Sequence, residues 1–202
     1  INKSNKIAMR EKHLGIWQST TWEEYGSSAK KTGLSLHSLG LRKGEVVSIA
    51  SEGIPEWLFT DMATIAVGGI SSGVYTTDSA AQVKYLINDS KTKFYFAENE
   101  EQLDKILEVR DECPSLEKII IYDMEGLHSF EDEQVISYEQ FIKLGEQLDE
   151  EKPDLWLNLL NAVKPDDIAI LVYTSGTTGP SKGAMISNKN LMYSVNIGLD
   201  IF

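Results

Sequence analysis

The sequence predicts an α/β fold in which a parallel or mixed sheet is flanked by helices. Two observations favour it: short apolar or β-branched runs alternate along the chain with segments of helical spacing, and several of those segments open on a helix-capping signature. The chain has 202 residues, 42% of them apolar, which is enough for a sizeable core in one large domain or two small ones.

Capping residues and glycines mark the predicted helices. Thr21 with Glu24 has the form of a capping box and opens a helix to Leu39, with Gly40 as its stop. Pro55 suits the first turn of a second helix. The remaining helices are predicted to begin at Ser79 and Ser137, to span 102–109 and 155–163, and to run from a cap at Ser187 or Asn188 to Phe202.

Between the helices, β-rich runs predict strands over 46–50, 70–75, 94–97, 119–122, 168–173 and 184–186. The run from Ile168 to Tyr173 is apolar throughout, which is typical of a strand covered on both faces. We expect the four tryptophans in the core or at its edge, namely Trp17, Trp22, Trp57 and Trp156.

The formal net charge of −12 is concentrated in one segment. Residues 98–154 hold 19 acidic and 5 basic residues, whereas the others hold 12 acidic and 14 basic residues. Because phosphate backbones are bound by clustered Lys and Arg, nucleic-acid binding through a basic face is disfavoured. We interpret the acidic segment as a solvated helical surface and assign it no function.

Cysteine usage and hydropathy indicate a cytoplasmic protein. Cys113 is the single cysteine, so an internal disulfide is excluded and a reducing compartment is expected. No run approaches 18 apolar residues, so no transmembrane helix is predicted. The chain opens on Ile1 without an apolar signal core, and we predict neither a secretory signal nor a natural start there.

One segment, residues 173–183, carries chemistry. It reads YTSGTTGPSKG, with three glycines, five hydroxyl side chains besides Tyr173 and one lysine, directly after the apolar run. Glycines let the backbone approach a ligand, and successive N–H groups, hydroxyls and a lysine form a concave site for an anion such as phosphate. A surface turn is the alternative interpretation. The Walker-type loop is absent, because Gly183 stands where that motif needs Ser or Thr.

The order of residues over Tyr173–Gly183 resembles the Y-T-S-G-T-T-G-x-P-K-G signature of the adenylate-forming enzymes at ten of eleven positions. This superfamily comprises acyl-CoA synthetases, luciferases and peptide-synthetase adenylation domains. The departure is Ser181, which stands where the family has proline, while Pro180 lies one residue earlier. A fixed φ and a missing N–H are thereby moved by one residue, whereas Lys182 keeps its place.

Softer matches favour the long-chain fatty acyl-CoA synthetase branch. They cover Ala8–Tyr25, Leu39–Val47, Ile54–Asp61 and Gly73–Asn88, with Thr76 in place of the usual proline. The resemblance implies two half-reactions. A fatty-acid carboxylate attacks the α-phosphorus of ATP to give acyl-AMP and pyrophosphate, and the thiol of coenzyme A then displaces AMP. Fatty acid, ATP and coenzyme A are the implied substrates, with Mg²⁺ as cofactor.

In such enzymes the loop holds the β- and γ-phosphates of ATP. The resemblance therefore implies phosphate binding by Thr174, Ser175, Gly176, Thr177, Thr178, Gly179, Lys182 and Gly183. Thr174 is also the implied Mg²⁺ contact. Tyr173 is expected either to have a structural role at the strand end or to line the pocket, and no catalytic residue is assigned in this chain.

Relatives carry the adenine-binding segment, the Mg²⁺-binding glutamate, the ribose-binding aspartate, the hinge and the catalytic lysine further along than Phe202. Residues 1–202 are therefore expected to be a truncated N-terminal part of the large domain of the luciferase-like fold, without the small C-terminal domain, and to be inactive alone. Activation of an aryl, short-chain or amino acid stays open, as does a non-catalytic nucleotide-binding scaffold. Oligomeric state and peripheral membrane contact of the full-length protein also stay open.

Overall fold

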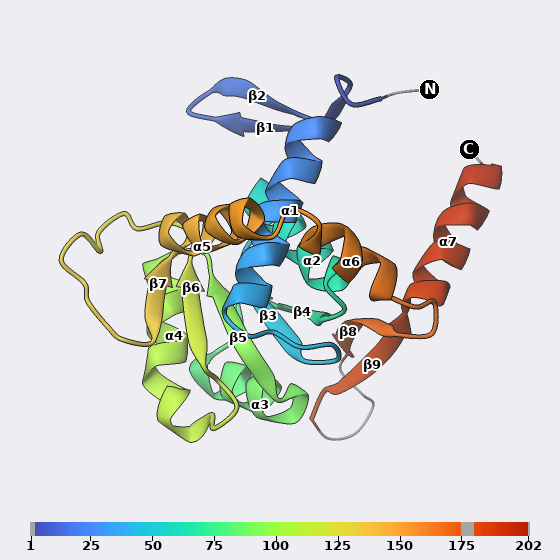
Figure 1. Cartoon of the computed structure of the whole chain (residues 1–202). Helices are drawn as coiled ribbons and strands as arrows, with labels where there is room; N and C mark the ends of the chain where they lie inside the picture. Colours follow the sequence, from blue (N-terminus) through green and yellow to red (C-terminus); the bar gives the residue numbers. More distant parts are fainter. Residues whose placement is uncertain (1–2, 175–179, 202) are drawn as a thin grey trace.

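The computed structural model describes residues 3–174 and 180–201 and contains a seven-stranded sheet, a separate two-stranded hairpin and helices (Figure 1). The elements in chain order are β1 (Ile7–His13), β2 (Ile16–Thr21), α1 (Trp22–Ser38), β3 (Val46–Ala50), α2 (Pro55–Ala66), β4 (Ile70–Val74), α3 (Ala80–Ser90), β5 (Thr92–Ala97), α4 (Glu100–Val109), a 3-10 turn (Arg110–Glu112), β6 (Lys118–Ile121), β7 (Val135–Ser137), α5 (Tyr138–Glu151), α6 (Leu155–Ala162), β8 (Ile168–Thr174), β9 (Lys182–Ser187) and α7 (Asn188–Ile201).

The large sheet is mixed, and its strand order is β7-β6-β5-β3-β4-β8-β9. Every pair from β7 to β8 is parallel, and β9 lies antiparallel to β8 at one edge. From β3 the chain crosses to β4 on one side and then returns to β5 on the other. Right-handed crossovers in opposite directions place helices on opposite faces of a sheet. The predicted α/β class with a mixed sheet is confirmed.

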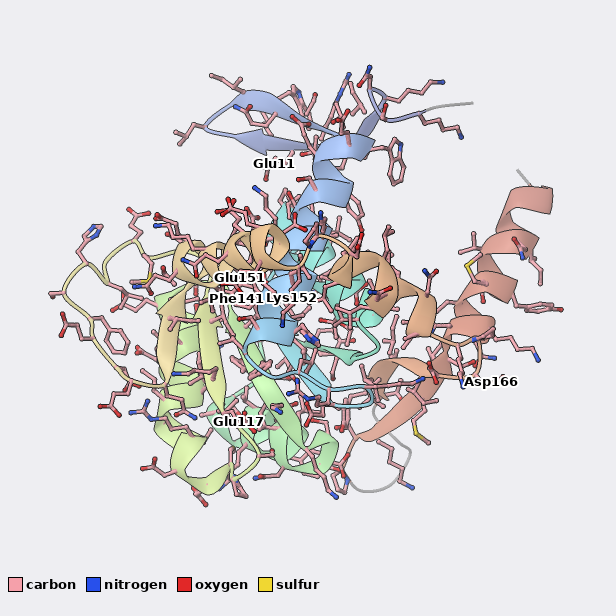
Figure 2. All side chains as sticks on the ribbon, in the orientation of Figure 1. Glu11, Glu117, Phe141, Glu151, Lys152 and Asp166 are labelled. Carbon is pink, nitrogen blue, oxygen red and sulfur yellow. The ribbon has the colours of Figure 1, made fainter. Side chains whose placement is uncertain are left out.

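Two apolar layers form the core, one on each face of the sheet. Buried residues of α3, α4 and the sheet make one layer, including Val83, Ile87 and Ile106. The other lies under α1, α2 and α5 and includes Phe141, which is labelled in Figure 2. Phe141 is fully buried, and its ring packs edge-on against Phe96 at 5.4 Å between centroids. Burial of both faces explains why the central strands are apolar.

The predicted caps are confirmed. Thr21, Ser79 and Ser137 each accept a hydrogen bond from the backbone N–H three residues on, and the Glu or Gln at that position accepts one in return. The open choice at the last helix is also resolved. Ser187 caps α7 by accepting from Asn190 N, whereas the Asn188 side chain donates to the carbonyls of Lys164 and Asp167.

The hairpin of β1 and β2 was not predicted. Leu14 and Gly15 form its two-residue turn with φ values of 46° and 83°, and leucine is not a residue that signals such a turn. The hairpin projects away from the sheet beyond the first turn of α1 (Figure 1). Trp17 and Trp22 are 64% and 50% exposed there, so the prediction that they belong to the core is wrong. Trp57 and Trp156, in contrast, pack against the core layer under α1.

The prediction that β8 is covered on both faces is also wrong. Within this strand Ala169 and Tyr173 are buried, whereas Val172 is 39% exposed. The strand pairs with β4 through only two residue pairs, Ser71 with Ile170 and Ser72 with Leu171, and its other neighbour is the largely exposed β9. In the described residues no helix is long and apolar enough to cross a membrane.

Candidate functional site

The ends of the Gly- and Ser-rich segment are held together by the last strand pair. β8 ends at Thr174 and β9 begins at Lys182, and these two residues are directly opposite each other in the antiparallel register. Opposed residues of such a pair direct their side chains to the same face. The hydroxyl of Thr174 and the stem of Lys182 therefore leave the backbone on one side, at the base of the loop.

The structure thus brings together three of the residues assigned to the phosphate site, Thr174, Lys182 and Gly183. Lys182 is exposed, and among the described residues it forms no ion pair, so its ammonium group is available to an external anion. The other assigned residues lie outside the described residues; they are Ser175, Gly176, Thr177, Thr178 and Gly179.

The ring of Tyr173 lies so close to Gly183 that little room is left for a side chain at this position. These residues are register partners, and a Cβ added to Gly183 would lie 3.1 Å from Cζ of the Tyr173 ring. The hydroxyl of Tyr173 donates to Oδ2 of Asp89 in α3 at 2.7 Å. Burial, helped by the hydrogen bond and the charge of Asp89, raises the pKa of Tyr173, so the hydroxyl remains a donor at neutral pH.

We expect Gly183→Ala to lower the free energy of unfolding by about 1–2 kcal/mol, because the added methyl group displaces the Tyr173 ring and weakens its bond to Asp89. The measurement is urea unfolding. Gly53→Ala is the matched control, since a Cβ there meets nothing within 4 Å. Equal stability of the two variants would contradict the packing of the ring on Gly183.

Helix α3 makes a second contact with the loop. The hydroxyl of Tyr85 donates to the backbone carbonyl of Ser181 at 2.7 Å. Pro180 and Ser181 also face the first turns of α3 across a hollow of about 400 Å³. Sequence reasoning missed Tyr85 and Asp89, because nothing in the sequence of a helix indicates contact with a loop more than 80 residues away.

An apolar groove of about 540 Å³ lies at the carboxyl ends of β3, β4 and β8, and Tyr173 at the start of the loop lines it. Its walls include Trp57, Leu58, Tyr75, Val172 and Tyr173. Tyr173 therefore has a structural role at the strand end through its bond to α3, and it also lines this groove. Its role in a ligand pocket stays a prediction. In open α/β sheets, ligands bind outside the carboxyl ends of strands where the crossover direction changes, and this groove has that location.

A second apolar groove, of about 640 Å³, lies between α2, α6 and α7 and contains no residue of the loop. We favour the smaller groove as the ligand site because it shares Tyr173 with the loop. No cluster of three or more His, Cys, Asp or Glu that could hold a metal occurs in the part of the chain that the structure describes. The Mg²⁺ role of Thr174 therefore stays a prediction.

Comparison with known families decides the classification. The sequence model of the AMP-binding enzyme family matches residues 2–200. The chain belongs to the AMP-binding enzyme family. The resemblance found at Tyr173–Gly183 is thereby confirmed.

Curated relatives in the family are similar to almost the whole chain. Long-chain-fatty-acid–CoA ligase ACSBG1 of Bos taurus is 32% identical over 191 residues, which cover 95% of this chain and 26% of that protein. The Homo sapiens protein of the same name is 31% identical over 192 residues, with the same coverage. The chain therefore spans about a quarter of the length of these relatives.

Solved structures share the fold. An anthranilate CoA ligase, AuaEII, in complex with anthranoyl-AMP has a TM-score of 0.76 and 22% identity, over 96% of this chain and 34% of that chain. Apo MatB from Rhodopseudomonas palustris has a TM-score of 0.71 and 22% identity, over 99% and 35% of the two chains. The predicted adenylate-forming fold is confirmed by these similarities.

Proposed function

We propose that the full-length protein is an AMP-forming long-chain fatty acid–CoA ligase, and that residues 173–183 hold the phosphates of ATP. One observation carries the proposal: in the segment with the family signature, Thr174 lies opposite Lys182 at the base of the loop, and the adjacent Tyr173 lines an apolar groove. An anion-binding loop next to an apolar surface suits a reaction that joins a nucleotide to a fatty acid.

The residues of this chain bind and orient the reactants. Lys182 supplies positive charge to the phosphates that leave as pyrophosphate, and the Thr174 hydroxyl contacts the same group. Mg²⁺, when bound, neutralises phosphate charge, and Thr174 would be one of its oxygen contacts. Because the attacking carboxylate is already a nucleophile, the contribution of this chain is positioning and charge stabilisation.

The proposal extends to the chain's organisation. Residues 1–202 would be the N-terminal part of the large domain, with the residues that complete catalysis elsewhere in the full-length protein. The 202-residue chain alone would not form acyl-AMP. Carboxylate-dependent ATP–pyrophosphate exchange by that chain would contradict this. We also propose a cytoplasmic location, because Cys113 is a buried free thiol.

A panel of carboxylic acids tests the substrate class. With the full-length protein, pyrophosphate release is expected to be fastest for palmitate, and kcat/KM should fall about fourfold for each CH₂ removed while the chain still contacts the groove. Reactions without acid provide the control. A preference for benzoate, acetate or an amino acid would favour another carboxylate-activating ligase, and ATP binding without pyrophosphate release would favour a non-catalytic scaffold.

A further inference from the structure

Helix α3 binds both limbs of the loop base through one of its faces. The outgoing limb is the end of β8, and the returning limb is residues 180–182. Tyr85 and Asp89 are four residues apart and so lie one turn from each other on the same side of the helix. Tyr85 donates to the Ser181 carbonyl on the returning limb, and Asp89 accepts from Tyr173 on the outgoing limb, each at 2.7 Å. The separation of the two limbs is therefore tied to one rigid element.

The Tyr85 contact falls at the residue where this chain departs from the family signature. Ser181 stands in the place of the proline, so the backbone before Lys182 lacks the restraint on φ that a pyrrolidine ring provides. The carbonyl of Ser181 belongs to the same peptide unit as the N–H of Lys182. A hydrogen bond to that carbonyl therefore orients the peptide from which the lysine side chain begins.

We propose that Tyr85 is a positioning residue. Its hydrogen bond fixes the orientation of the Ser181–Lys182 peptide, so that the backbone of Lys182 already has the conformation in which the side chain binds the ATP phosphates. This inference rests on the proposed function for its kinetic consequence. The restraint itself does not depend on that function, because the hydrogen bond joins two residues of this chain, Tyr85 and Ser181.

The Tyr85 hydroxyl is not needed to anchor helix α3 in the core. Helix α3 is already anchored in the core by Val83, Leu86 and Ile87, which are at most 6% exposed. The Tyr85 ring packs at the border of the same layer, and phenylalanine would keep that packing. Tyr85, Pro180 and Ser181 line the same hollow, so water can donate to the Ser181 carbonyl when the hydroxyl is removed.

The kinetic test is Tyr85→Phe in the full-length protein. We expect KM for ATP to rise and kcat/KM for ATP to fall about two- to tenfold, the range that one hydrogen bond supports. KM for palmitate and the melting temperature should be unchanged. Tyr25→Phe is the matched control, because the Tyr25 hydroxyl also donates to a backbone carbonyl, that of Leu58, but lies away from the loop.

A rescue variant tests whether the Tyr85 hydrogen bond supplies the backbone restraint that the missing proline would provide. Exchanging the two residues, Pro180→Ser with Ser181→Pro, restores the order of the family signature. In the Tyr85→Phe background this exchange should bring KM for ATP back toward that of the native protein. Failure of the rescue, or an equal rise of KM for ATP in Tyr25→Phe, would overturn the proposal.

Hydrogen–deuterium exchange without nucleotide separates this inference from the proposed function. Tyr85→Phe should speed exchange in the peptide covering 180–187, while peptides of α3 exchange as in the native protein. If the native protein gives no pyrophosphate release but this acceleration is seen, the ligase function fails and the restraint by Tyr85 stands. Unchanged exchange in 180–187 would overturn the restraint whatever the activity.

Discussion

Lys182→Ala is expected to lower kcat/KM for pyrophosphate release by the full-length protein about 100-fold to 1,000-fold, the usual cost of removing one donor that stabilises charge in a transition state. The expectation follows from geometry. Lys182 is the first residue of β9, it is opposite Thr174, and no carboxylate of the described chain neutralises it. Under the proposed function, this charge would stabilise the diphosphate that leaves ATP.

Two further variants make this result specific. Lys182→Arg keeps the positive charge but places it on a planar guanidinium group. It should retain part of the activity that Lys182→Ala loses, because guanidinium also binds phosphate. Lys189→Ala removes an exposed lysine seven residues further on, in α7, and should leave pyrophosphate release unchanged. Palmitate activation by Lys182→Ala at the native rate would show that the assigned role of this lysine is wrong.

The chemistry of the loop could be predicted from the sequence, because it is encoded in consecutive residues. Eleven positions from Tyr173 to Gly183 carry the glycines, hydroxyls and lysine that an anion site needs. What supports the loop could not be predicted. Tyr85 and Asp89 reach it from a helix whose own sequence explains only its cap and its buried face. Support of this kind depends on tertiary packing, which spacing does not encode.

The same distinction applies to the fold. Caps and the alternation of helix and strand are local, and the structure has the predicted ones in place, although β1, β2 and β7 were not predicted. Burial depends on what lies above each strand. An apolar strand such as β8 has the composition of a doubly covered strand, yet Val172 is exposed because helices of the described chain do not cover both of its faces. Trp17 was misjudged for the same reason, since the hairpin stands apart from the sheet.

Gly145→Ala is expected to cause the largest loss of stability among single methyl additions at the glycines whose surroundings the structure describes. Gly145 lies in α5 where that helix crosses α1, and a Cβ there would be 2.1 Å from the Lys31 carbonyl oxygen and 2.5 Å from Oγ of Ser35. The carbonyl belongs to a helix backbone and cannot turn aside, so the two helices must separate. We expect a cost of about 3 kcal/mol, at the upper end of overpacking effects.

Separation of α1 and α5 would also loosen contacts beside the crossing. The ion pairs Lys30–Asp149 and Lys31–Glu146, each 2.7 Å, join the same two helices, and Phe141 is fully buried one turn earlier in α5. The melting temperature should therefore fall by about 6–12 °C for a domain of this size. The measurement is thermal unfolding followed by circular dichroism.

Gly26→Ala is the matched control and should have the opposite sign. Gly26 lies in α1, has a helical φ, and a Cβ added there meets nothing within 4 Å. The same chemical change should stabilise the protein by about 0.5–1 kcal/mol, because alanine loses less backbone entropy than glycine in a helix. The difference between the two variants isolates the steric cost from helix propensity. Equal effects at Gly26 and Gly145 would mean that α1 and α5 do not approach as closely as the structure shows.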